Sequence, residues 1–466
     1  MRGRMTAAAQ PTASAEAAGA SAREAPLTNG YLPAAAFMHS GPTAIALLDL
    51  TPHAAPVVIS RPPESRDALM LVRLHGEPLG VHHLPDHAAL DAPGSLRMAA
   101  QHAFAPQITA HTARHCCTVA EDSCAGNTGA PSATSVAVIV PTGGRAATLG
   151  VCLRSLAAID HPGLEIIVVD NRPGAEGSRE TVEHWQAKDG RIRYVTEPRP
   201  GSSVARNRGI AATSAQLLAF TDDDVIVDPT WLRWLLAPFA DPQVTAVTGM
   251  VLPSMLKTPA QKLFENYAGF GKGVQRRRYN MAGDRAADRF LYPYWGGAFG
   301  SGNSMAFRRE SLLAQGGFDP ALGAGSKALA GADIYAMSAS ILRGGTLVYE
   351  PRSICWHTHR ETEEALRGQL FNYGVGLTAL FTKALLTDPR FVPAVLRSLS
   401  AVVRHRRVID EQAASGLMLP REYVRIQRRG LVRGPARYIR SRRWAAHLAL
   451  AQAVPEDSHV TAQQRS

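Results

Sequence analysis

The stretch Gln216 to Asp228, QLLAFTDDDVIVD, places an apolar run directly before three consecutive aspartates. Such a run predicts a short buried strand that ends at Asp222, Asp223 and Asp224. Three adjacent carboxylates repel one another unless a cation lies between them, and ligands that are all oxygen suit Mg²⁺ or Mn²⁺. The stretch therefore predicts a Mg²⁺ or Mn²⁺ site. The alternative is a solvated acidic turn that caps the next helix.

Five apolar stretches of this kind follow one another from residue 136, with starts separated by about 25 to 30 residues. Between the first two lies a helical pattern with apolar side chains at i, i+3, i+4 and i+7, namely Leu149, Cys152, Leu153 and Leu156. Strands that alternate with helices at this period predict βαβ units and an α/β fold with a mostly parallel sheet. The stretches begin at Val136 (VAVIV), Glu165 (EIIVV), Ile192 (IRYV), Leu217 (LLAF) and Val244 (VTAV).

Polar side chains follow each of the first four predicted strands. Pro141 and Thr142 lead into a glycine-bearing turn, and Asp170 follows the second strand. Arg206 lies in RPGSSVARNRG after the third strand, and the three aspartates follow the fourth. Because the carboxyl ends of parallel strands meet at one edge of a sheet, these groups are expected to converge. Guanidinium groups for phosphate, carboxylates for a cation and acceptors for a base or ribose together predict a nucleoside-diphosphate site.

Taken in order, the motifs of residues 135–386 resemble the family 2 glycosyltransferases. That resemblance implies the GT-A fold, a Rossmann-like, mostly parallel sheet flanked by helices that binds nucleotide sugars. The motifs that carry it are VAVIVPT, EIIVVDN, ARNRGI, FTDDDV, SGNSMAFRRESLLAQGGFDPALGAG, GADIYAMSASILRGG and VYEPRSICWHTHR.

The resemblance also implies roles for individual residues on the donor side. Asp222 and Asp224 match the metal ligands of a DxD motif, and His357 matches a histidine that approaches the metal or diphosphate, with His359 as the alternative. The residues that match nucleotide contacts are Pro141, Thr142, Asp170, Arg206 and Asp223.

The catalytic base implied by the resemblance is Asp333, at the start of a predicted helix. The alternative role for Asp333 is the N-cap of that helix. Ala332 departs from the family pattern, which has glutamate at this position. Residues 263–295 are rich in aromatic side chains and arginine, which suits a sugar or an anionic acceptor, and the matching acceptor residues are Trp295 and Asn303.

The function implied is metal-dependent, inverting transfer of a hexose from a UDP-, GDP- or dTDP-linked sugar to a hydroxyl of a glycan or lipid-linked acceptor, as in cell-envelope polysaccharide synthesis. One alternative is a nucleotidyltransferase, which would need a lysine-bearing phosphate loop, and residues 136–185 contain no lysine. A second alternative is a catalytically weak sugar-nucleotide-binding protein at a membrane surface, which Ala332 motivates.

Composition divides the 466 residues into five parts. Residues 1–65 show no sustained period and are expected to be a mostly disordered leader, without a secretory signal. Residues 66–112 are expected to form a small accessory module with a β-hairpin, 113–134 a linker, 135–386 the GT-A domain and 387–466 a basic, mainly helical region. The chain has no apolar run long enough for a membrane span.

The five cysteines have no disulfide-framework spacing, which favours a reducing compartment and predicts a cytoplasmic location. His115, Cys116, Cys117 and Cys124 resemble part of a zinc site, but no second CxxC-like pair completes it. The sequence therefore argues against a structural zinc site.

The formal net charge of +11 is concentrated near the C-terminus. Residues 390–443 contain fourteen arginines against three acidic residues, interleaved with apolar side chains. This pattern predicts contact with the anionic inner face of the cell membrane. Without a stacking platform or a nucleic-acid motif, no nucleic acid is expected as a partner, and the alternative is a solvated helical face.

Overall fold

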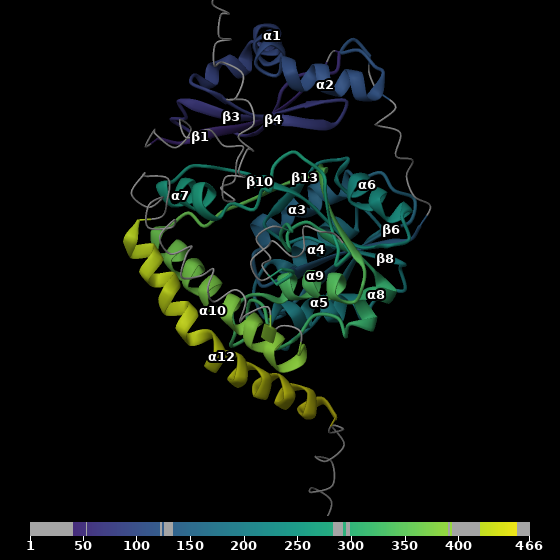
Figure 1. Ribbon diagram of the computed structural model, residues 1–466, viewed down its shortest axis with the longest axis vertical. Helices are drawn as coiled ribbons and strands as arrows, with labels where there is room; N and C mark the ends of the chain where they lie inside the picture. The colour runs from purple at the N-terminus through teal and green to yellow at the C-terminus, as the bar shows by residue number, and fades with distance from the viewer. Residues whose placement is uncertain are drawn as a thin grey trace, which may run out of the picture.

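The computed structural model describes residues 41–52, 54–121, 124, 134–282, 292–294, 299–389, 392–393 and 420–453. Within them, an N-terminal module lies on a larger α/β domain, and two long helices run along one flank of that domain (Figure 1). The predicted α/β fold is confirmed by the nine-stranded sheet of the larger domain.

The large sheet has the order β11-β13-β10-β12-β8-β5-β6-β7, with β9 paired to the end of β13. Strands β7, β6, β5 and β8 are parallel neighbours, and β10 is parallel to β13. Strand β12 is antiparallel to both β8 and β10, a feature that the βαβ pattern did not predict. The strands are β5 (Val136–Thr142), β6 (Leu164–Asp170), β7 (Ile192–Thr196), β8 (Leu217–Phe220), β9 (Val225–Val227), β10 (Val244–Pro253), β11 (Arg277–Tyr279), β12 (Met305–Arg308) and β13 (Thr346–His357).

Helices cover both faces of this sheet because its buried strands are apolar on both sides. Val138 and Val140 of β5 belong to one core cluster, and Ala137 and Ile139 to the other. The first cluster is covered by α3 (Ala146–Ala157), α4 (Ser178–Gln186) and α6 (Trp231–Leu236), followed by the 3₁₀ helix η4 (Ala237–Ala240). The second is covered by α5 (Ser202–Ala211), α8 (Arg309–Ala314) and α9 (Ala332–Leu342).

The N-terminal module is a four-stranded sheet with the order β2-β1-β3-β4. Its elements are β1 (Thr43–Asp49), β2 (Val57–Ser60), β3 (Asp67–Leu74), β4 (Glu77–Leu84), the 3₁₀ helix η2 (His87–Asp91), α1 (Pro93–Ala103) and α2 (Ala105–His115). The hairpin of β3 and β4 is where the sequence predicts it. The predicted start of the module is wrong, because β1 and β2 lie within the expected leader. Strand β1 is buried on both faces, so its sequence does not alternate between apolar and polar residues.

The predicted linker also differs from the structure at its start. Helix α2 continues to His115, and the side chains of Cys117 and Cys124 are buried against the module. The module thus extends through Cys124, since a cysteine behaves as a small apolar side chain when it packs.

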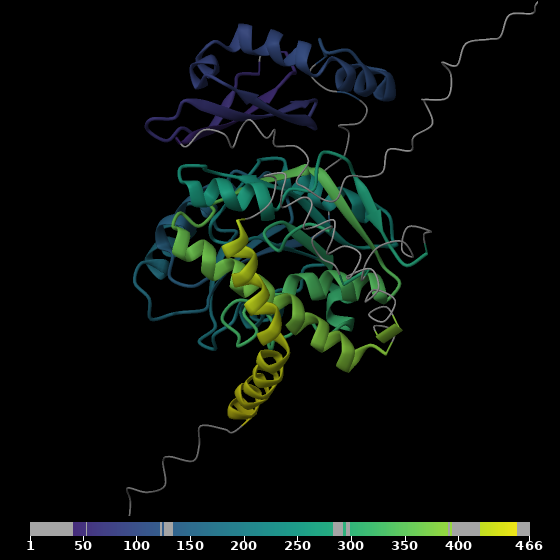
Figure 2. The same cartoon turned by 60° about the vertical axis from the view of Figure 1, so that its left-hand side comes forward.

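The module's sheet lies between its own helices and the large domain (Figures 1 and 2). Ile45 and Leu69 share a cluster with Leu252 and Trp356 of the large sheet. Polar contacts join the same two parts: Ser60 Oγ donates to Ser254 O at 2.6 Å, and Arg73 Nη1 lies 3.0 Å from Asp228 Oδ2.

Three helices lie beyond the sheet layers: α7 (Pro259–Ala268), α10 (Glu363–Thr387) and α12 (Arg421–Ala453). Helices α10 and α12 lie side by side in both views (Figures 1 and 2). A Cβ on Gly430 would collide with the Phe371 carbonyl oxygen and one on Gly434 with Thr378 Oγ1, so the two glycines allow the backbones to approach closely. Among the described helices, none combines the length and apolar character needed to cross a bilayer.

Candidate active site

The acidic centre, defined as Asp222, Asp223 and Asp224, lies at the carboxyl edge of the parallel strands. It follows β8 directly, and Thr142 at the end of β5 lies next to Asp170 at the end of β6 in the parallel register. Consecutive aspartates in extended and turn backbone point to different neighbours, so each carboxylate has its own environment.

Asp223 is the innermost carboxylate, with a fully buried side chain. Thr142 Oγ1 donates to its Oδ2 at 2.7 Å, and Arg145 pairs with its Oδ1. Burial raises the pKa of Asp223 to about 6, although the charge of Arg145 opposes this shift. Asp223 is thus bound to the turn after β5 rather than presented to solvent.

Asp222 is held from two sides. Arg206 Nη2, from α5, lies 3.1 Å from Asp222 Oδ1, and Asn303 Nδ2 donates to Oδ2 at 3.1 Å. The Asp222 side chain remains 31% exposed, while that of Arg206 is 7% exposed. The Arg206 guanidinium is therefore a fixed positive charge beside the Asp222 carboxylate, which is still partly exposed to solvent.

Asp224 has one oxygen occupied and one that lacks a hydrogen bond. Its Oδ2 pairs with Arg145. Its Oδ1 is buried and has no hydrogen-bond partner among the described residues, and His357 Nε2 is the facing atom at 3.4 Å. An unsatisfied buried carboxylate oxygen is costly unless a ligand completes it.

A chain of three side chains sets the proton positions on His357. Glu265, fully buried on α7, lies 2.6 Å from His359 Nε2, so a carboxylate there accepts the Nε2 proton. His359 Nδ1 then accepts from His357 Nδ1 at 3.0 Å. Burial lowers the pKa of His357 to about 4, so the imidazole is neutral at neutral pH and its Nε2 lone pair faces Asp224 Oδ1.

A divalent cation fits between these two atoms. An imidazole lone pair and a carboxylate oxygen repel each other when they face across 3.4 Å, and a cation bound by both removes that repulsion. One carboxylate oxygen and one imidazole nitrogen form a donor set that suits Mn²⁺ or Mg²⁺.

Asp333 lies near the acidic centre, on the same side of the molecule. Its Oδ2 accepts a hydrogen bond from Gly302 N at 3.0 Å, and Asn303, the next residue, donates to Asp222. The predicted N-cap role is wrong: Gly331 is the N-cap, with φ of 94°, because the chain needs a left-handed turn there. The Asp333 side chain bonds to Gly302 instead of to its own helix.

The remaining predicted residues are placed as follows. Pro141 lies in β5, half-buried. Asp170 is buried, and its oxygens accept from Tyr194 OH at 2.7 Å and from Arg172 N at 2.9 Å. Trp295 lies outside the described residues.

Two residues of the site have no role in the sequence prediction. Arg145 lies in the predicted turn after β5, and its two ion pairs were not foreseen because its reach across to β8 depends on the sheet. Glu265 is a lone acidic residue in the helical stretch KLFENYA, and a charge on an otherwise buried helix face was the available indication.

The family comparison covers the part of the chain that contains the acidic centre. The sequence model of glycosyl transferase family 2 matches residues 137–314. A pre-mycofactocin glycosyltransferase of Mycobacterium tuberculosis is 26% identical over 240 residues, which is 49% of this chain and 44% of that protein. The validoxylamine A glucosyltransferase of Streptomyces hygroscopicus subsp. jinggangensis is 35% identical over 122 residues, 24% of this chain and 28% of that protein.

The chain spans less than half the length of these curated relatives. Among solved structures, a mannosyltransferase from Pyrobaculum calidifontis, in complex with GDP-Man and Mn²⁺, aligns with a TM-score of 0.43 and 19% identity, covering 68% of this chain and 90% of that one. The match to the family begins in β5, ends in α8 and contains the acidic centre. The resemblance to glycosyl transferase family 2 is therefore confirmed over residues 137–314.

Proposed function

We propose that this chain transfers a sugar from a nucleoside-diphosphate sugar to an acceptor hydroxyl, with inversion at the anomeric carbon. The observation that carries the proposal is the short bridge between two carboxylates. Gly302 binds Asp333, and Asn303 binds Asp222. A carboxylate suited to proton transfer thus lies two hydrogen bonds from the acidic centre.

On the donor side, the end of β5 and the acidic centre supply contacts of two kinds. Pro141, Thr142 and Asp170 would line the nucleoside site at the ends of the parallel strands, and Asp223 would support that site from behind by holding Thr142 and Arg145. Arg206, fixed by Asp222, adds positive charge where a diphosphate would bind.

The cation site of this proposal uses Asp224 Oδ1 and His357 Nε2, with Asp222 at its rim. A Mg²⁺ or Mn²⁺ ion held by these residues would neutralise the charge that grows on the leaving diphosphate. Glu265 and His359 keep the His357 lone pair in position for it.

On the acceptor side, Asp333 accepts the proton of the attacking hydroxyl. Gly302 holds one oxygen of Asp333, and a Cβ at Gly302 would lie 2.8 Å from that oxygen, so the close approach needs glycine. One attack from the face opposite the leaving group inverts the anomeric centre, and no second nucleophilic carboxylate is needed. Asn303 would bind the acceptor or the sugar beside Asp222.

The first experiment measures turnover. Purified protein is incubated with Mn²⁺, a panel of UDP-, GDP- and dTDP-linked sugars, and glycan or lipid-linked acceptors. Transfer or donor hydrolysis with one class of donor supports the proposal. Saturable donor binding without any turnover supports a catalytically weak sugar-nucleotide-binding protein instead.

Two substitutions separate the two carboxylate roles. Asp224→Asn should abolish the metal-dependent part of donor binding. Asp333→Asn should leave donor binding unchanged and lower kcat by about 10²- to 10⁴-fold, the usual contribution of a general base. Asp241→Asn, at a half-buried position outside the site, is the matched control. Full turnover by Asp333→Asn would remove Asp333 from the mechanism.

We further propose that the exposed face of α12 contacts anionic lipid at the cytoplasmic face of the membrane. One side of α12 is buried on α10 through Tyr423, Gly430, Gly434 and Tyr438. The opposite side carries eight exposed arginines against one exposed glutamate, Glu422: Arg421, Arg425, Arg428, Arg429, Arg433, Arg440, Arg442 and Arg443. Juxtaposed arginines on a helix surface attract an anionic bilayer.

Vesicle sedimentation tests this surface. Changing Arg428, Arg429 and Arg433 to Gln should weaken partition onto phosphatidylserine vesicles roughly 100-fold, at about 1 kcal/mol per arginine. The control changes Arg154, Arg172 and Arg179, which are exposed on the large domain, to Gln. Equal losses in both variants, or preferential binding to duplex DNA or RNA, would contradict the proposal.

A further inference from the structure

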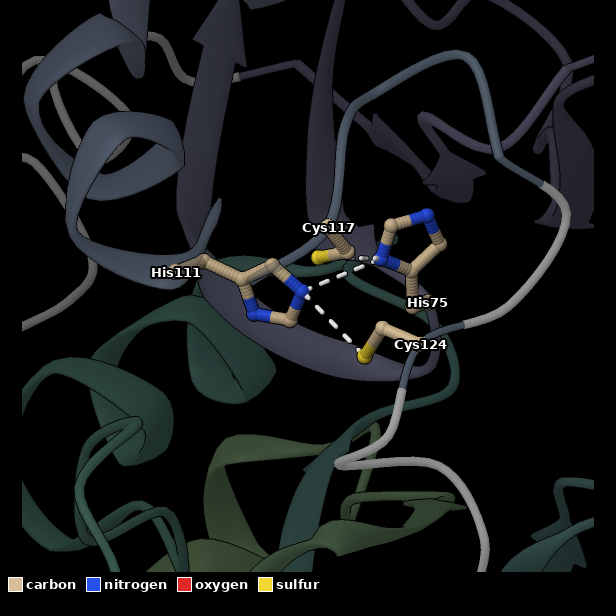
Figure 3. Close-up of side chains that lie close together, drawn as sticks. All are labelled: His75, His111, Cys117 and Cys124. Atoms are coloured by element: carbon tan, nitrogen blue, oxygen red, sulfur yellow. Dashed lines mark hydrogen bonds between the residues drawn. The ribbon is translucent and has the colours of Figure 1, made fainter. Parts of the chain in front are cut away.

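Four side chains from separate segments meet in the interior of the N-terminal module (Figure 3). They form the His/Cys cluster, defined as His75, His111, Cys117 and Cys124. His75 lies in the turn between β3 and β4, His111 on α2, and the two cysteines beyond the end of α2. The histidines are each 2% exposed, Cys117 is 7% and Cys124 is 6% exposed.

The spacing of the four atoms matches a tetrahedral ion. One ligand atom of each residue lies within 4.8 Å of all the others. His75 Nδ1 and His111 Nε2 are 3.1 Å apart, and each nitrogen lies 3.7 or 3.6 Å from the nearer sulfur. Tetrahedral Zn²⁺, with Zn–N near 2.05 Å and Zn–S near 2.3 Å, requires N···N of about 3.3 Å and N···S of about 3.6 Å.

The outer partners of the histidines fix which nitrogens carry protons. His75 Nε2 lies 2.8 Å from the backbone carbonyl oxygen of Glu121, an acceptor only, so Nε2 is the donor. His111 Nδ1 lies 3.2 Å from Glu77 Oε2 and donates to that carboxylate. In the neutral imidazoles, the two inward nitrogens therefore both carry lone pairs.

Two lone pairs that face each other across 3.1 Å inside a protein repel, and neither nitrogen can donate to the other. A cation bound between them turns this repulsion into two bonds. Histidine ligands held from outside by a carboxylate or a backbone carbonyl are the usual arrangement around protein-bound zinc. Both histidines here have such a partner.

We propose that His75 Nδ1, His111 Nε2, Cys117 Sγ and Cys124 Sγ bind one structural Zn²⁺ ion. The donor set of two nitrogens and two sulfurs favours zinc over Mg²⁺ or Mn²⁺, which prefer oxygen. Four buried protein ligands leave no open coordination position for a substrate, as in a structural zinc site. Binding releases the two thiol protons to solvent, since the ligands are thiolates.

The ion would join three separate segments of the module. It ties the β3–β4 turn to the end of α2 and to Cys124, twelve residues before β5 begins. A small module with a limited core gains stability from such a link, and the zinc-binding free energy adds to its folding free energy.

The cluster differs from the group that the sequence suggested. Cys117 and Cys124 belong to it, but Cys116 is exposed. His115 bonds to Glu77 Oε2 at 3.1 Å and so lies outside the four ligands. The missing pair is supplied by His75 and His111, so two cysteines and two histidines complete the set without a second cysteine pair.

Metal analysis of the purified full-length chain tests the proposal. Protein from zinc-supplemented cells should retain about one zinc ion per chain after gel filtration. Cys117→Ser and Cys124→Ser should each lose most of this zinc, whereas Cys116→Ser, the neighbouring exposed cysteine, should retain it. Equal zinc loss in Cys116→Ser and Cys124→Ser would overturn the assignment.

Cobalt substitution of the unaltered chain removes the dependence on variants that fail to fold. Co²⁺ in this site should give the intense visible absorption of a tetrahedral ion and a thiolate-to-cobalt charge-transfer band. Little zinc together with an octahedral cobalt spectrum would overturn the proposal, and so would a Cys117–Cys124 disulfide found by mass spectrometry. Because the cluster lies in the other module, the result does not depend on the proposed transferase activity.

Discussion

The acidic centre and the His/Cys cluster orient a histidine in the same way but offer different ligand atoms to a cation. In both, a carboxylate orders the imidazole protons so that a lone pair points inward: Glu265 acts through His359 on His357, and Glu77 acts directly on His111. The acidic centre presents oxygens and one nitrogen beside arginines. The His/Cys cluster presents two sulfurs and two nitrogens, all buried.

The difference predicts two kinds of cation binding in one chain. At the acidic centre, Asp222 stays partly exposed, and substrate phosphates would complete the coordination. This suits an ion that arrives and leaves with the donor. The His/Cys cluster is closed by four protein ligands, which suits an ion bound once, during folding.

The largest expected effect comes from removing the exchangeable ion alone. Brief passage through EDTA should lower transfer activity by roughly 100-fold or more, because the diphosphate loses several kcal/mol of charge stabilisation. Added Mn²⁺ or Mg²⁺ should restore activity, while the zinc content measured by atomic spectrometry stays constant. Loss of zinc in the same EDTA step would contradict the proposed difference between an exchangeable and a retained ion.

A smaller effect is expected when the outer carboxylate of the acidic centre is changed. Glu265→Gln allows the amide to donate, so that His359 and His357 can reverse their protons. The Mn²⁺ concentration for half-maximal activity should rise about 10- to 100-fold, the usual cost of an outer partner. Glu361→Gln, exposed and near the same histidines in sequence, is the control and should change nothing.

The corresponding change at the His/Cys cluster is Glu77→Gln. Zinc affinity, measured by competition with a chromogenic chelator, should fall about 10-fold, because the amide can turn its NH₂ toward His111. Glu121→Gln is the matched control: His75 bonds to the backbone carbonyl of Glu121, which the substitution keeps. A larger loss from Glu121→Gln than from Glu77→Gln would contradict the assigned partners.

The smallest effect is expected from changing Arg114, which pairs with Glu77, the outer partner of His111. Arg114 Nη1 pairs with Glu77 Oε1 at 2.8 Å, but the arginine side chain is 59% exposed. Such pairs contribute only about 0 to 1 kcal/mol. Arg114→Gln should therefore change zinc affinity less than about fivefold in the same competition assay. A loss as large as that of Glu77→Gln would show that charge, rather than the direct hydrogen bond, orders His111.

The sequence predicted the acidic centre more completely than the His/Cys cluster for a physical reason. Parallel strands bring their ends to one edge, so Thr142, Asp170 and Asp222 could be placed together from periodicity alone. His357 was found through its motif at the end of β13. Glu265 was missed because α7 reaches the site only through tertiary packing.

The His/Cys cluster depends on a contact that periodicity does not encode. His75 and His111 are 36 residues apart, in a hairpin turn and a helix, and only the packing of α2 on the small sheet brings them together. Strand β1 was missed for a related reason, since burial on both faces removes the alternation by which a strand is recognised.

The glycine contacts between α10 and α12 have a mechanical consequence. A helix whose backbone lies directly against that of its neighbour has little freedom to move outward, so we expect the arginine face to keep its position relative to the large domain. If lipid binds that face, the attachment would determine the tilt of the whole protein on the membrane. Acceptors carried by the bilayer would then meet the acidic centre at one fixed height above the membrane.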